Sequence, residues 1–215
     1  MNLMHKIIAK NVRGSNVLDI GFAQAPNLCI SKDKHKVYGI DIQKSGGLPA
    51  NYIEIKGEVN LNSGDIPYAD GYFDTVIMAD VIEHVENPSR VLRECNRVLK
   101  DAGRLIVSTP QANYPYDLFK NSLYSFFGIN LDRDPGSHLS NWTILDFKRL
   151  LNKNSFVIKK LQGGFVHLPF GINIPVTWFP ILGWQAVYVA EKTGSPKTWV
   201  YTKDDKGKHF LIAGK

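Results

Sequence analysis

Two acidic residues stand at the ends of two neighbouring apolar runs, at a spacing that could bind a nucleoside. Residues 16–20 ("NVLDI") contain Asp19 and lead into Gly21, and a second run ends at Asp41, twenty residues after Gly21. Glycine lets the backbone approach a ligand closely because it has no Cβ. A carboxylate at the end of the second strand can accept hydrogen bonds from both ribose hydroxyls. An ordinary strand and turn, with Asp41 as a helix cap or a solvated side chain, would give the same pattern.

A second group of reactive side chains is Glu83 and His84, in "EHVENP". An unperturbed imidazole can accept a proton near neutral pH, so His84 is a candidate general base. Glu83 could orient the ring or share a metal ion, but two ligands are few for a divalent cation, and no metal is predicted. The alternative is that both residues only begin the next helix.

The pattern of apolar residues predicts the strands and helices that position these acidic and basic side chains. Short apolar runs predict buried strands at 16–20, 36–41, 52–59, 73–80 and 103–109, as in a parallel sheet covered on both faces. Further strands are expected at 155–161 and 208–215. We therefore expect an α/β fold, with a doubly wound, seven-stranded, mostly parallel sheet, an antiparallel last strand and a cap insertion. Residues 1–215 are expected to form a single domain, with insertions at about 111–140 and 164–207.

Two helices are clearly indicated. Asn87 can cap the first, Pro88 fits its first turn, and Gly103 lies where a left-handed residue would end it. The second is expected at 143–152, and a short helix is expected ahead of the first strand. In a sheet of this kind ligands bind beyond the carboxyl ends of the strands, which is where Asp19 and Asp41 fall.

Composition narrows the class of protein. The chain has 215 residues, is 44% hydrophobic and carries a net charge of +6. That charge favours anionic partners without selecting among them, and the absence of a long Lys/Arg run makes a nucleic-acid partner unexpected. Two cysteines are too few for a disulfide framework, so a reducing, cytoplasmic location is expected.

Residues 170–190 hold no charged residue over almost the length of a membrane span. Pro175 and Pro180 weaken a spanning helix, so a buried cap or a membrane-surface segment is the better interpretation. The segment leaves open a peripheral membrane contact and an apolar, lipid-linked substrate.

Two cofactors compete for the first loop. A nicotinamide dinucleotide needs backbone N–H groups for its pyrophosphate and a glycine at the third loop position, which here is Pro26 and offers no N–H. S-adenosylmethionine has no phosphate, and one glycine followed by small residues is enough for it. The sequence therefore favours S-adenosylmethionine.

The stretch 64–110, "GDIPYADGYFDTVIMADVIEHVENPSRVLRECNRVLKDAGRLIVSTP", together with "VLDIG", resembles the class I S-adenosylmethionine-dependent methyltransferases. It is most similar to the small-molecule, ubiquinone-biosynthesis-like group known as methyltransferase type 11. The resemblance covers about residues 16–161. The chain departs from the family at Ala23 and Ala25, where glycines usually stand, and at Asn60, where an acid is usual and for which Asp65 is an alternative.

The resemblance implies a set of cofactor-binding residues. Asp19 and Gly21 would line the methionine end, Asp41 would bind the ribose, and Asn60 would face the adenine. The full set is Asp19, Gly21, Phe22, Ala23, Asp41, Ile42, Asn60, Leu61, Ala79 and Asp80.

The expected function is methyl transfer from S-adenosylmethionine to a small-molecule acceptor, as O-methylation of a lipid- or glycan-related intermediate, with His84 as the catalytic residue. Tyr114, His138 and Trp142, from the long insertion, could line the acceptor pocket. A packed cap and a helix start at Asn141 would explain the same residues. A non-catalytic module that binds S-adenosylmethionine and an NAD-dependent oxidoreductase remain as alternatives.

Overall fold

The structure is a computed structural model that describes residues 3–23, 26–43, 47–112, 114, 126–127, 138–167, 173–196, 199–203 and 209–213. Its helices are α1 (Leu3–Asn11), α2 (Pro88–Val98) and α4 (Ile144–Lys153), with the 3₁₀ turns η1 (Ile82–His84) and η3 (Pro180–Leu182). The strands are β1 (Asn16–Ile20), β2 (Lys36–Ile40), β3 (Tyr52–Lys56), β4 (Phe73–Ala79), β5 (Leu99–Pro110), β6 (Phe156–Gly163), β7 (Phe165–His167), β8 (Asn173–Pro175), β9 (Gln185–Lys192), β10 (Trp199–Lys203) and β11 (His209–Ala213).

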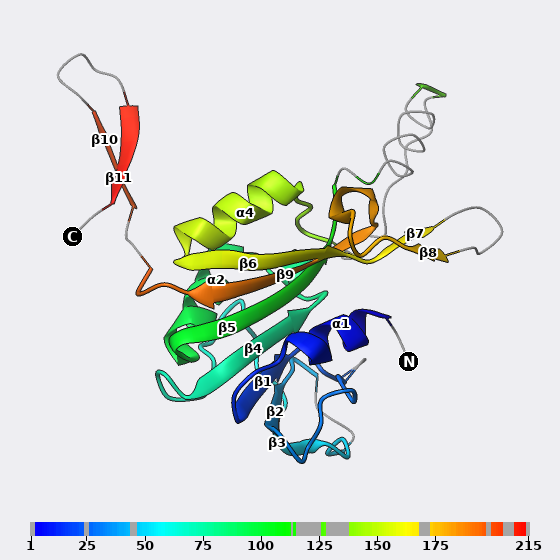
Figure 1. Ribbon diagram of the computed structural model, residues 1–215. Helices are drawn as coiled ribbons and strands as arrows, with labels where there is room; N and C mark the ends of the chain where they lie inside the picture. Colours follow the sequence, from blue (N-terminus) through cyan, green and yellow to red (C-terminus); the bar gives the residue numbers. More distant parts are fainter. Residues whose placement is uncertain are drawn as a thin grey trace.

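Seven strands form one sheet in the order β3-β2-β1-β4-β5-β9-β6, as Figure 1 shows. The pairs among β3, β2, β1, β4 and β5 are parallel, and β9 runs antiparallel to both of its neighbours. Strand order reverses at β1 and β4, which is where such sheets bind ligands. The predicted doubly wound, mostly parallel sheet with one antiparallel strand is confirmed.

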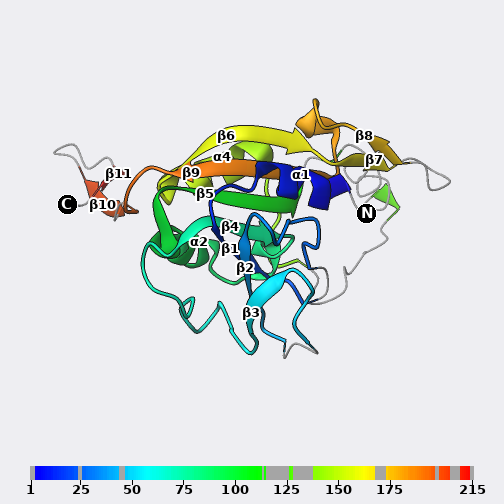
Figure 2. The same cartoon turned by 60° about the horizontal axis from the view of Figure 1, so that its bottom comes forward.

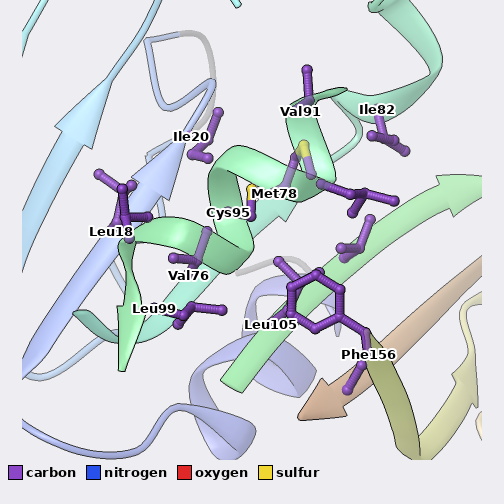
Figure 3. Close-up of a cluster of buried hydrophobic side chains, with 14 of the residues drawn as sticks. Leu18, Ile20, Val76, Met78, Ile82, Val91, Cys95, Leu99, Leu105 and Phe156 are labelled. Carbon is purple, nitrogen blue, oxygen red and sulfur yellow. The ribbon is translucent and has the colours of Figure 1, made fainter. Parts of the chain in front are cut away.

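Helices cover the two faces of the sheet. On one face, Met4, Ile7 and Ile8 of α1 pack on strand residues that include Val17 and Ile77. On the other face, α2 and α4 cover the larger core, part of which Figure 3 shows. Figure 2 shows the sheet with α1 in front of it. The labelled core residues of Figure 3 are Leu18, Ile20, Val76, Met78, Ile82, Val91, Cys95, Leu99, Leu105 and Phe156.

Helix α2 begins at the residue that the sequence predicted, but it ends earlier than predicted. The Asn87 side chain accepts a hydrogen bond of 3.0 Å from the Arg90 N–H, and Pro88 is the first helical residue. The helix ends at Val98, before the expected stop, because the chain passes directly into β5. Ala102 takes the left-handed conformation, with a φ of 54°. The glycine at 103 is required for another reason, since a Cβ there would lie 2.6 Å from the Lys100 carbonyl oxygen.

The seventh strand of the sheet comes from the uncharged segment and not from the C-terminus. Residues 185–190 are buried in β9 between β5 and β6, whereas His209–Ala213 pairs with Trp199–Lys203 in a separate hairpin. A strand covered on both faces needs no charged residue, which explains much of the apolar run. Among the described residues, no helix is long and apolar enough to cross a membrane.

Helix α4 begins one residue later than predicted. The Thr143 side chain caps it by accepting from the Asp146 N–H at 3.1 Å, so the expected cap at Asn141 is wrong. Most of the insertion at 111–140 lies outside the described residues.

Candidate functional site

A cavity of about 510 Å³ lies at the carboxyl ends of β1, β2, β4 and β5, with α1 along one side. Its volume is in the range of small-molecule sites in proteins. The lining residues are Met4, His5, Ile8, Asp19, Ile20, Gly21, Asn27, Ile40, Asp41, Ile42, Gln43, Val59, Asn60, Leu61, Asn62, Ala79, Asp80, Val81, His84, Val85 and Ser108.

Gly21 makes the turn at the end of β1. Its φ is 78°, a conformation that favours glycine, and its N–H donates to the Ile40 carbonyl at 2.9 Å. An added Cβ would overlap Cγ2 of Val81. The residue is therefore needed both for its backbone angle and for the close approach of the segment after β4.

Asp41 holds the backbone of two loops. Its Oδ2 accepts from the Ala23 N–H at 2.9 Å, and its Oδ1 accepts from the Gln43 N–H at 2.8 Å. Each carboxylate oxygen can accept more than one hydrogen bond, so both can still accept hydroxyl groups from a ligand in the cavity.

Asp19 is fully buried beneath the loop that follows β1. Its Oδ2 accepts from Asn27 Nδ2 at 2.7 Å and from the hydroxyl of Tyr52 in β3. Burial raises the pKa of Asp19 to about 6, against the lowering effect of these hydrogen bonds. Asp19 thus links β1 to the loop and to β3.

Asp80 follows β4 with a φ of 54°, which is unusual for a residue with a side chain. Its Oδ1 accepts from the Ser108 hydroxyl at 2.8 Å, and its Oδ2 accepts from Gln185 Nε2 at 2.7 Å. Burial raises its pKa, although these hydrogen bonds favour the ionised form. Strained backbone held by several contacts is common at functional sites.

Glu83, His84 and His138 form a cluster at the wall of the cavity. Their ligand-type atoms all lie within 4.8 Å of one another, and the two imidazole rings are 5.0 Å apart between centroids. Glu83 is buried, and burial together with the charge of Asp80 raises its pKa to about 8. These are the residues of the described chain that could hold a metal ion.

The cavity brings together most of the residues expected from the sequence. Phe22 does not line it and instead packs in the core, with its ring centroid 5.4 Å from that of Tyr52. Ala23 contributes its N–H to Asp41 without lining the cavity. The expected residues that do line it are Asp19, Gly21, Asp41, Ile42, Asn60, Leu61, Ala79, Asp80 and His84.

The three expected acceptor residues are not among the lining residues. His138 lies next to His84, which lines the cavity. Trp142 packs on Phe147 of α4, with ring centroids 5.3 Å apart. Tyr114 is buried beside the end of β5, where its N–H donates to the Gln111 carbonyl at 3.3 Å. Their role in acceptor binding stays a prediction.

Sequence reasoning missed several lining residues. His5 belongs to α1, which the sequence indicated only as a lead-in helix; the spacing of Met4 and Ile8 was the available signal. Asn27 and Ser108 gave no signal of their own, because nothing local distinguishes them from ordinary loop and strand residues.

Comparison with known proteins favours the methyltransferases over the NAD-dependent oxidoreductases. A family model described as "Methyltransferase domain" matches residues 18–107, somewhat less than half of the chain, and this range contains most of the cavity wall. Residues 18–107 are therefore similar to the methyltransferase domain family. The resemblance to class I S-adenosylmethionine-dependent methyltransferases is confirmed.

Relatives with assigned names match parts of the chain. A ubiquinone biosynthesis O-methyltransferase of Pseudomonas aeruginosa is 32% identical over 107 residues, which are 50% of this chain and 40% of that protein. A probable S-adenosylmethionine-dependent methyltransferase of Mycobacterium tuberculosis is 45% identical over 52 residues, or 24% of this chain and 19% of that protein. The chain thus spans less than half the length of these curated relatives.

Solved structures agree in fold along nearly the whole chain. A S-adenosylmethionine-dependent methyltransferase from Methanosarcina mazei superposes with a TM-score of 0.61 at 24% identity, covering 89% of this chain and 99% of that one. A possible histamine N-methyltransferase from Thermotoga maritima gives a TM-score of 0.62 at 16% identity, covering 89% and 90%. At these identities the likeness shows the fold.

Proposed function

We propose that this protein transfers a methyl group from S-adenosylmethionine to an oxygen atom of a small-molecule acceptor related to lipids or glycans. The observation that carries the proposal is the charge of the cavity wall. Asp19, Asp41 and Asp80 line it, and none of the described residues that line it is Lys or Arg. Such a wall favours a cationic ligand and disfavours an anionic one.

This charge distinguishes the two candidate cofactors. S-adenosylmethionine supplies a methyl group on a positively charged sulfur, and the methyl passes to the acceptor while the electrons of the broken carbon–sulfur bond stay on sulfur. A nicotinamide dinucleotide would place two phosphate charges against the same carboxylates. The missing loop glycines therefore matter less than they would for a phosphate-binding loop.

The residues at the end of β2 fit a nucleoside. Asp41 keeps acceptor capacity on both oxygens, as a ribose requires. Ile42 lies next to it on the cavity wall and is 60% exposed, which leaves an apolar surface for an adenine ring. In the part of the chain that is described, Asn27 also lines the cavity and has a buried side-chain oxygen without a partner.

The residues after β4 support transfer to oxygen. A hydroxyl must lose its proton as it is methylated, and His84 lies at the cavity wall, close enough to Asp80 for the His84 charge to lower the pKa of that carboxyl against the effect of burial. The Pseudomonas aeruginosa relative is named as an O-methyltransferase. These two observations favour oxygen over nitrogen or carbon as the methylated atom.

A lipid-related acceptor is supported by the segment between β8 and β9. It exposes Trp178 at 90%, Phe179 at 64% and Ile181 at 62%, with no charged residue among them. Exposed aromatic and aliphatic side chains of this kind suit a membrane surface. We propose that the peripheral membrane contact expected for 170–190 is made by residues 178–182, because 185–190 are buried in β9.

Calorimetry with the full chain tests the proposal at the cofactor step. We expect S-adenosylhomocysteine to bind and NADH not to bind. Asp41→Asn should weaken binding about tenfold or more, because a hydrogen bond to a charged group contributes about 1.5–3 kcal/mol. The control is Asp33→Asn, at an exposed position before β2, which should bind as the wild type does.

A screen of acceptors, with S-adenosylhomocysteine release as the readout, tests the transfer step. Release that depends on a hydroxyl-bearing acceptor supports the proposal. Cofactor binding with no release for any acceptor class would favour a non-catalytic binding module instead. Stabilisation by NADH alone would favour the oxidoreductase alternative and overturn the proposal.

A further inference from the structure

The cluster of Glu83, His84 and His138 has a property that the cofactor does not explain. It places one carboxylate and two imidazoles within 4.8 Å of one another, from two segments that are 54 residues apart in the chain. We propose that these three residues bind a divalent transition-metal ion of the zinc type. The inference deepens the proposed function and, in its role for the acceptor, rests on it.

Glu83 is the observation that points to a ligand. The residue is only 1% exposed, and in the described structure neither of its carboxylate oxygens has a hydrogen-bond partner. The Thr109 hydroxyl favours the ionised form of Glu83 but makes no hydrogen bond of normal geometry with it, so its oxygen is also without a partner. A buried carboxylate with no partner is costly, and a bound cation would offset that cost.

His138 is held in place by the backbone. The N–H groups of Leu139 and Ser140 donate to the Glu83 carbonyl at 2.8 and 3.1 Å. These two bonds fasten the residues after His138 to the turn that carries Glu83 and His84. The third ligand is therefore positioned by contacts that do not involve its own side chain.

The ligand types select the metal. Two imidazole nitrogens and one carboxylate oxygen suit zinc or iron(II) sites that keep a position open for a substrate, at ligand distances of about 2.0–2.2 Å. Mg²⁺ prefers an all-oxygen set and is the wrong ion for this site. To bind zinc the side chains would close in to roughly 3–3.5 Å between ligand atoms, which small side-chain rotations can provide.

Asp80 is close to the cluster but does not belong to the group whose ligand atoms lie within 4.8 Å of one another. Its two oxygens instead accept hydrogen bonds from Ser108 and Gln185. The metal site therefore uses three protein ligands and leaves the remaining position to the cavity side, where His84 lies on the wall. An acceptor oxygen in that position would have its hydroxyl pKa lowered, with its proton passing to water. His84 would then act as a ligand instead of as the base.

Metal binding is tested on the full chain without cofactor or acceptor. We expect calorimetry to show one Zn²⁺ bound per chain, with Mg²⁺ not competing, and Co²⁺ to give the visible absorption of a nitrogen- and oxygen-ligated site. His138→Ala and Glu83→Gln should each weaken Zn²⁺ binding by at least about 100-fold, since loss of an outer partner alone costs 10–100-fold. Circular dichroism checks that both variants fold.

The matched control is His35→Ala. His35 lies before β2, where its Nδ1 contacts the Gly14 carbonyl oxygen at 2.6 Å, so its removal should leave Zn²⁺ binding unchanged. Wild-type chain that binds no stoichiometric Zn²⁺ would overturn the inference. So would folded Glu83 and His138 variants that bind as tightly as the wild type. Zinc binding without any methyl transfer would count against the proposed function and leave the metal site standing.

Discussion

Gln185, the first residue of β9, donates a hydrogen bond of 2.7 Å to Asp80 at the end of β4. The bond joins strands on either side of β5, and Ser108 of β5 donates to the other oxygen of the same carboxylate. The strand that closes the sheet thereby fixes a side chain of the cavity wall. The antiparallel strand contributes to the candidate site as well as to the core.

This bond should be measurable as a coupling energy. In a double-mutant cycle of Gln185→Met and Asp80→Asn, we expect the free energies of unfolding to show a coupling of about 1–3 kcal/mol, because the acceptor is a buried carboxylate. Urea denaturation of the four proteins gives the value. A coupling below about 0.5 kcal/mol would mean that the bond contributes little.

Gly21→Ala should destabilise the protein more than Gly71→Ala. Both glycines have positive φ, 78° and 63°, so both substitutions introduce backbone strain of about 1 kcal/mol or more. Only at Gly21 does the new Cβ meet another side chain, that of Val81, whereas nothing lies within 4 Å at Gly71. Overpacking adds about 1–3 kcal/mol. Equal losses in thermal or urea unfolding would show that the contact with Val81 relaxes freely.

The pattern of the sequence predicted the parts of the fold that depend on local signals. Apolar runs placed β1, β2 and β4, and Asn87 with Pro88 marked the start of α2. The candidate cofactor residues Asp19 and Asp41 were found because each stands at a strand end, and the ends of parallel strands meet at one edge.

What the sequence could not predict depends on long-range contacts. An uncharged run reads alike as a buried strand or as a membrane-surface segment, and only pairing with β5 and β6 shows that 185–190 is a strand. His138 reaches His84 through two backbone bonds to Glu83 that have no local signal. The contact of Tyr52 with Asp19 likewise joins residues 33 positions apart.

Asp19 should give the stability a distinct pH dependence. Its pKa is about 6 in the folded protein and 3.8 in the unfolded reference, so the folded state binds the extra proton between these values. The stabilisation is present below pH 3.8 and is lost as pH rises through 6. Relative to Asp19→Asn, the wild type should lose about 2 kcal/mol between pH 4.5 and 7. A difference that does not change with pH would show that the two pKa values are equal.

The apolar segment around η3 should bind lipid surfaces. The double variant Trp178→Ser and Phe179→Ser removes two exposed aromatic side chains. We expect it to bind liposomes that contain anionic lipid about tenfold more weakly, or worse, in co-sedimentation. The reason is that burial of one large apolar side chain contributes about 1.5–3 kcal/mol. Leu145→Ser on α4 is the control, because Leu145 is 56% exposed but stands apart from that segment. Equal binding by all three proteins would assign the exposed aromatics another role. Selective loss in the double variant, with cofactor binding intact, would assign lipid-surface binding to this segment, which Gln111 Nε2 joins to the end of β5 through the Gly183 carbonyl at 2.6 Å.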